Sequence, residues 1–365
     1  MKRFGLPHAV CLLTFSLLVT TASAEDLGSP DSSVFAGNGE RSKRDQPYAS
    51  GQPSQDRSSM RLGNAFGVEI KGGGVWITSV DDHCIYTGDS NQGPLTRVAG
   101  NGVLGYEGDG GPADQASFNW PHEVRVDADG NLFIADTRNH AIRRVDGKTQ
   151  IVTTLAGNGT AGFAGEGEAG SNAQFNQPHS VVLDGSGGLL IADTINHRLR
   201  RLDLNTGVVS TISGTGERKL PTEGADAASA PLFGPRSLAV DANSIWIVLR
   251  EGNSIWRIDR KTNQLHRVAG TGKKGYSGDG GPPLEATFRG PKGLTIDTQQ
   301  RVLVVDTENH AIRRIDLKQN RIETVMGGTR AKQTFQLKRP HGIAYSDALG
   351  FLVGDSENHR VLQGR

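Results

Sequence analysis

A repeat of nearly constant period runs through most of this chain and constrains its fold more than any other feature. The copies end at glycines separated by 57, 57, 56 and 57 residues, namely Gly100, Gly157, Gly214, Gly270 and Gly327. Each copy holds four short apolar runs separated by turn residues, as in PHEVRVDADGNLFIADTRNHAIRRVDGKTQIVTTLAG at 121–157. Long repeats with four strand-like runs per unit are typical of propeller blades. The repeat therefore predicts an all-β ring of blades.

The copies predict a six-bladed β-propeller of four-stranded antiparallel blades over residues 25–365. The blades are expected near 65–100, 121–157, 178–214, 235–270, 291–327 and 340–363. The last copy has only three runs, whereas residues 33–39 match the final run of a repeat and stand alone. We expect this N-terminal strand to complete the C-terminal blade from outside, because closing the ring removes an exposed sheet edge. The first run of each blade should be innermost.

Residues 1–24 read as a secretory signal peptide. They combine a basic start, an apolar run too short to span a bilayer comfortably, and the small residues Ala22-Ser23-Ala24 before a cleavage point. Cleavage before Glu25 predicts a secreted or periplasmic protein, with a retained anchor as the alternative. Cys84 is then the single cysteine, so the exported chain has no intramolecular disulfide, and we expect a small buried thiol.

The overall charge argues against two classes of partner. The formal net charge is +1, and the sequence pI is about 7.9. This balance creates no global field that would attract nucleic acid or an anionic membrane. No apolar stretch after the leader is long enough to insert into a membrane. A closed ring has no long free edge to pair, so a monomer is expected.

Two features of the connections between blades have structural readings. Gly-Asp-Gly-Gly at 108–111 and 278–281 offers one carboxylate and precedes no helical pattern, so a packed turn is favoured over a calcium loop or a phosphate cradle. Residues 40–62 are rich in Ser, Gln, Arg and Pro and are expected to form a mobile loop.

The combination of these motifs resembles the NHL-repeat family of β-propellers. It consists of GYSGDGGP, an Ala-x-Phe, a proline, a segment such as VDADGNLFIADTRNHAIRRVD and a closing VAGNG, and it covers nearly all of the mature chain. The resemblance implies the propeller fold. It does not fix the function, because the family includes RNA-binding, protein-binding and catalytic members.

Asn-His pairs recur at the same place in four blades, at 139–140, 196–197, 309–310 and 358–359. Histidines repeated around a wide ring lie too far apart to share one ion. We therefore expect each pair to act locally at the turn into the third strand. The aspartate three positions before each Asn should cap N–H groups of that turn.

The position after the proline that opens each blade varies while its flanks stay constant, which favours a site carried on the repeat scaffold. Blade by blade it holds Phe66, His122, His179, Arg236, Lys292 and His341. Because this position begins the innermost strand, all six side chains should surround the mouth of the central channel. Three physical readings stay open: a three-histidine zinc-type site, an anion-binding funnel, or groups that are merely solvated.

The Pro-His steps also resemble those of the peptidylglycine α-amidating lyase domain, a six-bladed propeller related to NHL repeats in which three such histidines hold zinc. The resemblance implies zinc ligation by His122, His179 and His341, with Arg236 as a candidate catalytic residue. The disulfides of that domain are absent here.

These observations predict an exported propeller whose channel mouth and long-loop face bind a polar or anionic ligand, such as a glycan, a protein or a small anion. Phe66, Arg236 and Lys292 are the predicted ligand-binding residues. The alternative is a lyase or hydrolase that depends on zinc or another divalent metal held by the three histidines. The sequence shows no nucleophile–base pair, catalytic carboxylate pair or cofactor fingerprint, so it leaves open whether the protein is an enzyme.

Overall fold

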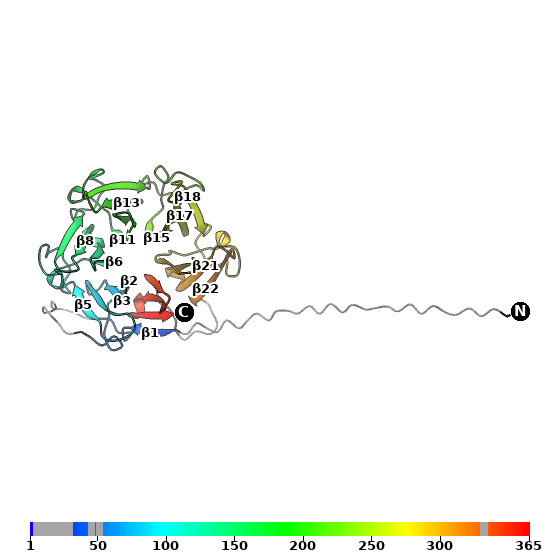
Figure 1. The fold of residues 1–365 in the computed structure, drawn as a ribbon, viewed down its shortest axis with the longest axis horizontal. Coiled ribbons are helices and arrows are strands. Elements are labelled where there is room, and N and C mark those ends of the chain that lie inside the picture. Colours follow the sequence, from blue (N-terminus) through cyan, green and yellow to red (C-terminus); the bar gives the residue numbers. More distant parts are fainter. Residues whose placement is uncertain (3–31, 43–47, 49–53, 329–334) are drawn as a thin grey trace.

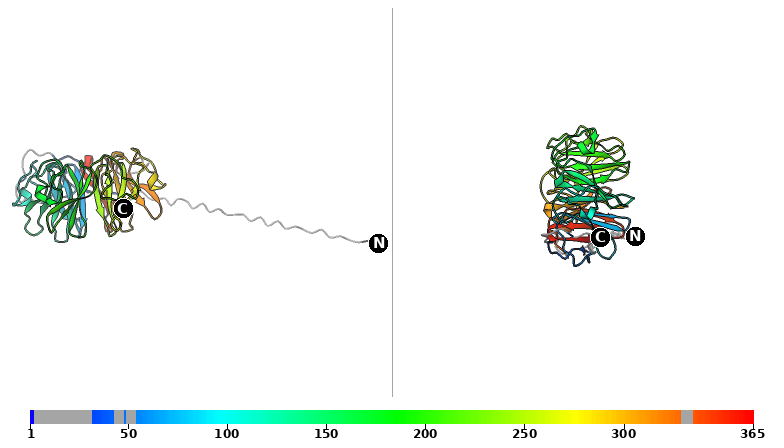
Figure 2. Two further views of the ribbon diagram at one scale, coloured as in Figure 1. Left: turned by 90° about the horizontal axis from the view of Figure 1, so that it is seen from above. Right: turned by 90° about the vertical axis from the view of Figure 1, so that its left-hand side faces the viewer.

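The computed structural model describes residues 1–2, 32–42, 48, 54–328 and 335–365, and these are the residues meant below. They form a closed ring of blades around a central axis (Figure 1), which is disc-shaped when seen from the side (Figure 2). The predicted signal peptide lies outside the described residues except for Met1 and Lys2.

The predicted propeller is confirmed, since the described strands form six antiparallel sheets, one per blade. The first blade contains β2(Ala65–Lys71), β3(Gly74–Ser79), β4(Cys84–Asp89) and β5(Thr96–Ala99). The second contains β6(Pro121–Val126), β7(Leu132–Asp136), β8(Ala141–Val145) and β9(Val152–Ala156). The third contains β11(Pro178–Leu183), β12(Gly188–Asp193), β13(Arg198–Asp203) and β14(Val208–Ser213), and the short β10(Glu168–Ala169) adds to its outer edge.

The other three blades repeat this order. The fourth contains β15(Pro235–Val240), β16(Ser244–Leu249), β17(Ser254–Asp259) and β18(Leu265–Ala269). The fifth contains β19(Leu294–Ile296), β20(Val302–Asp306), β21(Ala311–Asp316) and β22(Arg321–Gly327). The sixth contains β23(Ile343–Ser346), β24(Gly350–Asp355), β25(Arg360–Gly364) and β1(Ser33–Ala36). Single 3-10 turns lie at η1(Ala113–Gln115), η2(Thr137–Asn139), η3(Gly170–Asn172), η4(Pro283–Glu285), η5(Thr307–Asn309) and η6(Ser356–Asn358).

The ring closes as predicted. Strand β1 pairs antiparallel with β25, with Ser33 opposite Gln363 and Val34 opposite Leu362, and so forms the outer strand of the last blade. The blue start and red end of the described blades therefore lie side by side (Figure 1). This pairing covers the edge that β25 would otherwise expose.

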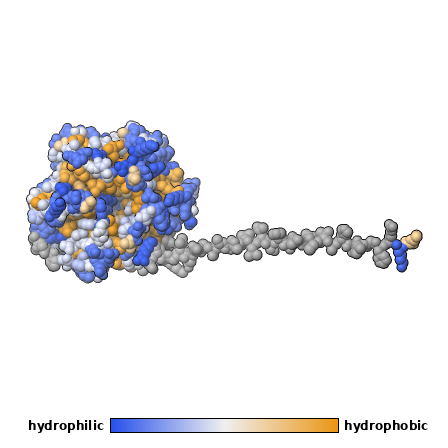
Figure 3. All heavy atoms as spheres, in the orientation of Figure 1, coloured by the Kyte–Doolittle hydropathy of each residue, from blue (hydrophilic) through white to orange (hydrophobic). Residues whose placement is uncertain are grey.

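The innermost strands line the central channel, and the core lies between adjacent blades. Strand β6 contacts β2 on one side and β11 on the other, and β15, β19 and β23 continue the ring back to β2. The second strand of each blade is packed on both faces, as the wholly buried β7 shows. Its Phe133 and Ala135 pack against Val181 and Ile191 of the next blade. On the face drawn in Figure 3, hydrophilic side chains dominate the rim and apolar ones lie nearer the centre.

The Asn-His histidines connect neighbouring blades, which confirms their local structural role. His140 adopts a left-handed backbone conformation with φ of 53°. Its Nδ1 accepts the backbone N–H of Gln177 at 3.1 Å, directly before the proline that opens the next blade. His197 and His310 accept the N–H groups of Gly234 and Arg339 in the same way. Each histidine thus helps to fix where the next inner strand begins.

The repeated aspartates and the Gly-Asp-Gly-Gly turns hold buried arginines. The prediction that this aspartate caps N–H groups of its own turn is wrong, because Asp136 makes no such bond to the backbone of the turn. It accepts the backbone N–H of Asn119 in the preceding connection at 2.7 Å and the side-chain amide of Asn139 at 2.8 Å. It also lies 3.4 Å from the guanidinium of Arg143, which is fully buried and donates to Asp109 at 2.7 Å. The Gly-Asp-Gly-Gly turn is therefore packed against the blade, as predicted.

Two further predictions concern the first blade. The thiol of Cys84 is buried, as expected, and donates to the carbonyl oxygen of Gly100 at 3.4 Å. For the expected mobile loop at 40–62, the described residues Tyr48, Met60 and Leu62 are buried in the core of this blade, and Gln55 bridges to Leu95. The described part of this connection is thus packed, which its polar composition did not predict.

Candidate ligand site at one mouth of the channel

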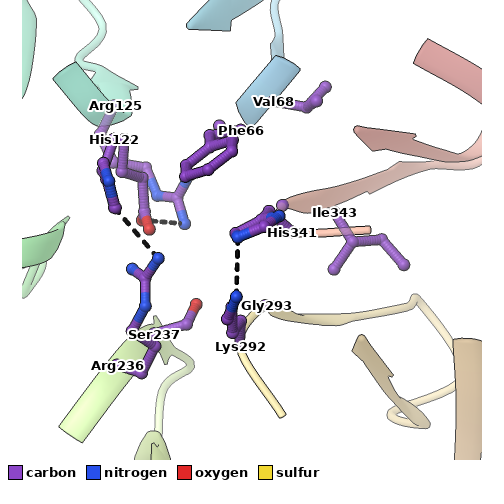
Figure 4. Close-up of a pocket in the computed structure, with 13 residues that line it drawn as sticks. Phe66, Val68, His122, Arg125, Arg236, Ser237, Lys292, Gly293, His341 and Ile343 are labelled. Carbon is purple, nitrogen blue, oxygen red and sulfur yellow. Dashed lines mark hydrogen bonds and ion pairs between the residues drawn. The ribbon is translucent and has the colours of Figure 1, made fainter. Parts of the chain in front are cut away.

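The six variable residues come together as the sequence predicts. All of them line one pocket at a mouth of the central channel, namely Phe66, His122, His179, Arg236, Lys292 and His341. Each follows the first residue of an inner segment, so the repeat geometry turns six side chains toward one axis; Figure 4 shows five of them. His179 is half-buried and the other five are buried. Their part in binding stays a prediction.

The structure adds residues that the sequence reasoning missed. The residue before each opening proline has a positive φ, and Trp120, Gln177 and Arg339 from this position line the same pocket. Arg250 also lines it, at the place where the second and third blades carry a threonine. Both positions vary inside a uniform repeat, so the signal that found the first ring could have found them.

His122 and Arg236 form one buried pair. The guanidinium nitrogen of Arg236 lies 3.0 Å from Nδ1 of His122 (Figure 4). A guanidinium only donates, so Nδ1 accepts and the proton of the neutral ring resides on Nε2. Nε2 is buried and has no hydrogen-bond partner among the described residues. Burial, assisted by the nearby His179 and Arg236, holds the pKa of His122 well below its ordinary value. His122 therefore has a neutral ring whose Nε2–H donates to none of the described residues.

Lys292 and His341 form a second buried pair. Nζ of Lys292 lies 2.8 Å from Nε2 of His341. Nδ1 of His341 lies 2.9 Å from the carbonyl oxygen of Arg339, which can only accept, so Nδ1 carries the ring proton and Nε2 keeps its lone pair. Burial, followed by the positive charges of Arg236 and Arg339, lowers the pKa of Lys292 to about 6. At pH 7 this amine is mostly neutral.

Aromatic contacts orient the histidines. Phe66 stacks on His341, with ring centroids 3.7 Å apart and planes 11° apart. Its edge meets His122 at 4.8 Å, and His122 lies 4.5 Å from the ring of His179. The positions of these rings are therefore set by packing as well as by hydrogen bonds.

Carboxylates lie deeper in the channel and are already paired. Glu123 forms an ion pair with Arg125 at 2.6 Å, and Arg125 reaches Glu69 at 3.2 Å. Burial raises the pKa of Glu123 to about 7, against the opposing effect of Arg125. In contrast, no described carboxylate forms an ion pair with Arg236, and Glu308 approaches Lys292 only to 3.7 Å. The mouth thus holds two buried basic side chains, Arg236 and Lys292, with little compensation from carboxylates.

The three histidines, as they lie here, do not fit a three-ligand zinc site. Nδ1 of His122 faces a guanidinium, and both ring nitrogens of His341 are engaged, one of them beside the amine of Lys292. Within the described ranges, no group of three His, Cys, Asp or Glu side chains is placed to hold a metal ion. Metal binding by His122, His179 and His341 stays a prediction.

Fold and repeats together define a six-bladed β-propeller, and the repeats themselves have a known family. Four segments match the NHL repeat, at residues 118–144, 175–202, 288–315 and 337–363. The chain belongs to the NHL-repeat β-propellers, which confirms the resemblance. The first and fourth blades fall outside these matches, and they carry Ser79 and Leu249 where the others have the capping aspartate.

Two curated relatives illustrate what the chain resembles in sequence. It is 28% identical over 280 residues to NHL repeat-containing protein 2 of Gallus gallus, covering 66% of this chain and 38% of that protein. It is 29% identical over 108 residues to a probable peptidyl-alpha-hydroxyglycine alpha-amidating lyase of Caenorhabditis elegans, covering 29% of each. The chain spans well under half the length of the curated relatives it matches first.

Solved structures share the fold. An auxiliary nutrient-binding protein of Bacteroides thetaiotaomicron superposes with a TM-score of 0.61 at 15% identity, over 91% of this chain and 75% of that one. At this identity the likeness concerns the fold alone. Among the described residues, no helix has the length and apolar character needed to cross a membrane.

Proposed function

We propose that this propeller binds a small anionic ligand, carrying a carboxylate or phosphate, at the channel mouth. One observation carries the proposal: the guanidinium of Arg236 is buried against the neutral ring of His122, and no described carboxylate forms an ion pair with it. Burying a charge without a partner is costly, and a bound anion would supply the missing partner. The neutral His122, with its free Nε2–H, adds a donor for the same oxygen atoms.

The rim of the pocket supports selection of anions. Arg250 and Arg339 lie at the mouth, paired with Glu251 at 2.6 Å and Glu308 at 2.8 Å. Such partly exposed ion pairs can exchange partners at modest cost, whereas the deeper Arg236 and Lys292 have no closely paired carboxylate to exchange. The pocket, with a volume of about 320 Å³, suits a small molecule or the end of a larger glycan or protein group.

Binding of matched ligands tests the proposal. The purified chain from Glu25 onward is titrated with sulfate, phosphate, citrate and a sugar acid, and with the neutral sugar of the same size, while heat stability and calorimetric binding are followed. Anions should stabilise the protein and the neutral sugar should not. Equal binding of both classes, or undiminished anion binding by Arg236→Met, would overturn the proposal.

A metal-dependent lyase or hydrolase remains a second candidate, favoured by the partial similarity to the Caenorhabditis elegans lyase and by the free Nε2 of His122. Such a site would need His341 to release Lys292 and His122 to turn from Arg236. Elemental analysis of protein purified without chelators tests it, beside the variant His122→Ala/His179→Ala. One zinc per chain that the variant loses would support the lyase reading; no metal at neutral pH would remove it.

Export is proposed from the leader sequence. A secreted or periplasmic location would place the mouth in contact with extracellular glycans, proteins or small anions. Mass measurement of the protein recovered outside the cytoplasm decides it: an N-terminus at Glu25 supports export with cleavage, and an intact Met1 in the cytoplasm contradicts it.

A further inference from the structure

Lys292 has surroundings that anion binding alone does not require. Its side chain is 7% exposed, yet it lines both the inner space of Figure 4 and the outer pocket, so a small ligand in that pocket meets its amine. Salt-bridging lysines place their ammonium against a carboxylate. Here the nearest contact is instead an imidazole lone pair, at 2.8 Å, and Glu308 is 3.7 Å away.

The neighbouring imidazole is fixed as a proton acceptor. Nδ1–H of His341 is directed at the carbonyl oxygen of Arg339 and at Oγ of Ser356, both at 2.9 Å. The hydroxyl of Ser356 donates to the carbonyl of Ala65 at 2.7 Å, so its oxygen is free to accept from the ring. The stacked Phe66 holds the ring plane. Nε2 therefore keeps its lone pair toward Nζ of Lys292.

The charge around this amine favours its neutral, nucleophilic form. Arg236, Arg250 and Arg339 all disfavour a further positive charge on Lys292, and Glu308 alone among the major neighbours favours one. Desolvation in the pocket acts in the same direction and is the largest cause of the lowered pKa. A lysine desolvated beside other cations is the arrangement that activates amines for attack on carbonyl groups.

We propose that Lys292 forms a reversible imine with a ligand that carries both a carboxylate and an aldehyde or ketone, such as a small 2-oxo acid. The inference rests on the proposed anion site, which would hold the carboxylate near Arg236 and leave the adjacent carbonyl carbon for Lys292. A purely anionic ligand without a carbonyl would use the same cations but leave the amine unreacted.

The step balances without any further reagent. The lone pair of Nζ forms a bond to the carbonyl carbon, and the π electrons move to the oxygen. Nε2 of His341 takes the proton that the new C–N bond releases and returns it to that oxygen. The oxygen is then a hydroxyl group. The nitrogen lone pair forms the C=N bond as this hydroxyl leaves, and Nε2 of His341 passes the second amine proton to it, so that it leaves as water. One amine and one carbonyl give one imine and one water, with no oxidation or reduction.

Reductive trapping tests the inference. The full mature chain is incubated at pH 7 with pyruvate and sodium cyanoborohydride, and its peptides are analysed by mass spectrometry. Lys292 should gain one reduced pyruvate adduct at least about tenfold faster than the exposed Lys148 and Lys261, because an ordinary lysine is almost fully protonated at this pH. Labelling of Lys292 no faster than these two lysines would overturn the inference.

Two variants and a neutral ketone separate this inference from the proposed function. Lys292→Arg should abolish the adduct, with Lys292→Met as the replacement if the arginine variant does not fold. Stabilisation of the wild type by pyruvate and sulfate without any adduct would overturn imine formation and would still support the anion site. Trapping of butanone on Lys292 as fast as pyruvate would show that no anion site recruits the ligand, which contradicts both.

Discussion

Two buried arginines of this propeller, Arg143 and Arg236, differ in how the fold compensates their charge. Arg143 is fully buried in a blade, and Asp109 and Asp136 lie against its guanidinium. Arg236 is buried at the channel mouth, and its close contact is a neutral histidine. The first charge is paired with carboxylates within the fold, whereas no described carboxylate forms an ion pair with the second. The lack of a paired carboxylate, more than burial of the charge, distinguishes the candidate site.

The repeat explains why the difference exists. Arg313 in the fifth blade repeats the arrangement of Arg143, with Asp279 at 2.9 Å and Asp306 at 3.4 Å. Arg236 has no such copies, since its equivalents are three histidines, a lysine and a phenylalanine. The arrangement of Arg143 thus recurs in three blades, at Arg143, Arg200 and Arg313, whereas the position of Arg236 varies around the ring.

The largest expected effect on stability comes from replacing Arg143, the arginine whose charge is paired within the fold. Arg143→Met should lower the free energy of unfolding by about 3 kcal/mol or more, because it leaves the buried carboxylate of Asp136 without its cation. Binding of anions at the mouth should not change in the folded variant. Urea denaturation and calorimetric titration measure the two quantities.

Arg144→Met provides the matched control on the same strand. Arg144 pairs with Asp146 at 2.9 Å but is one-third exposed, with 33% of its side chain accessible, so its loss should cost less than about 1 kcal/mol. An equal cost for Arg143 and Arg144 would mean that compensation of the buried charge contributes nothing, and the comparison would fail.

Removing Lys292, the other buried basic side chain at the mouth, should change the free energy of unfolding in the opposite direction. Lys292→Met should stabilise the folded chain by about 1 kcal/mol or more at pH 7 and weaken anion binding about tenfold or more. In a chain of this size such a gain raises Tm by about 2–4 °C. A variant that is less stable than the wild type across the neutral range would show that Lys292 is compensated after all.

The stability gain of Lys292→Met should depend on pH in a defined direction. Burial holds the folded pKa of Lys292 near 6, well below its unfolded value. Between these two values the unfolded chain binds the proton and the folded chain does not, so wild-type stability rises with pH. The advantage of the variant should therefore be largest near pH 6 and shrink by up to about 1.4 kcal/mol per pH unit toward pH 10. Urea titrations of both proteins at several pH values measure it, and a constant difference would contradict the lowered pKa.

Anion affinity should depend on the protonation state of the same side chain, Lys292. A bound anion favours the ammonium form of Lys292, and Arg236, Arg250 and Arg339 oppose that form while Glu308 supports it. Binding above pH 6 should therefore take up a proton, and affinity should fall as pH rises, by at most about tenfold per unit. Calorimetry in buffers of different ionisation enthalpy detects the uptake. Lys292→Arg should bind without it, and uptake that persists there would point to another group, such as His341.

The sequence predicted the fold and the first ring of the site because both depend on one repeat. A period near 57 residues, four apolar runs and an orphan strand at 33–39 suffice to place every blade and its closure. The ring at the mouth followed because the position after the opening proline has the same geometry in every blade.

The pairings within the ring could not be read from the sequence. Whether His341 meets Lys292 or Phe66 depends on side-chain lengths across the axis, and in the structure it meets both. Convergence of His122, His179 and His341 was predicted, but the arginine and lysine that lie between them determine what their nitrogens face. The position of Arg250 also varies, with Val80, Thr137, Thr194, Thr307 and Ser356 in the other blades, but the sequence alone did not show that it faces the channel mouth.

The smallest effects should separate the two kinds of histidine. His140→Ala removes an acceptor for the N–H of Gln177 between blades and should cost about 1 kcal/mol of stability with no change in anion binding. His122→Ala removes the ring that accepts from Arg236 and offers Nε2–H to a ligand, so it should weaken binding a few-fold. Denaturation and titration of the pair form one experiment. If His140→Ala weakens binding as much as His122→Ala does, the distinction between repeated and variable positions no longer divides structure from recognition, and the site would have to be sought across the whole ring.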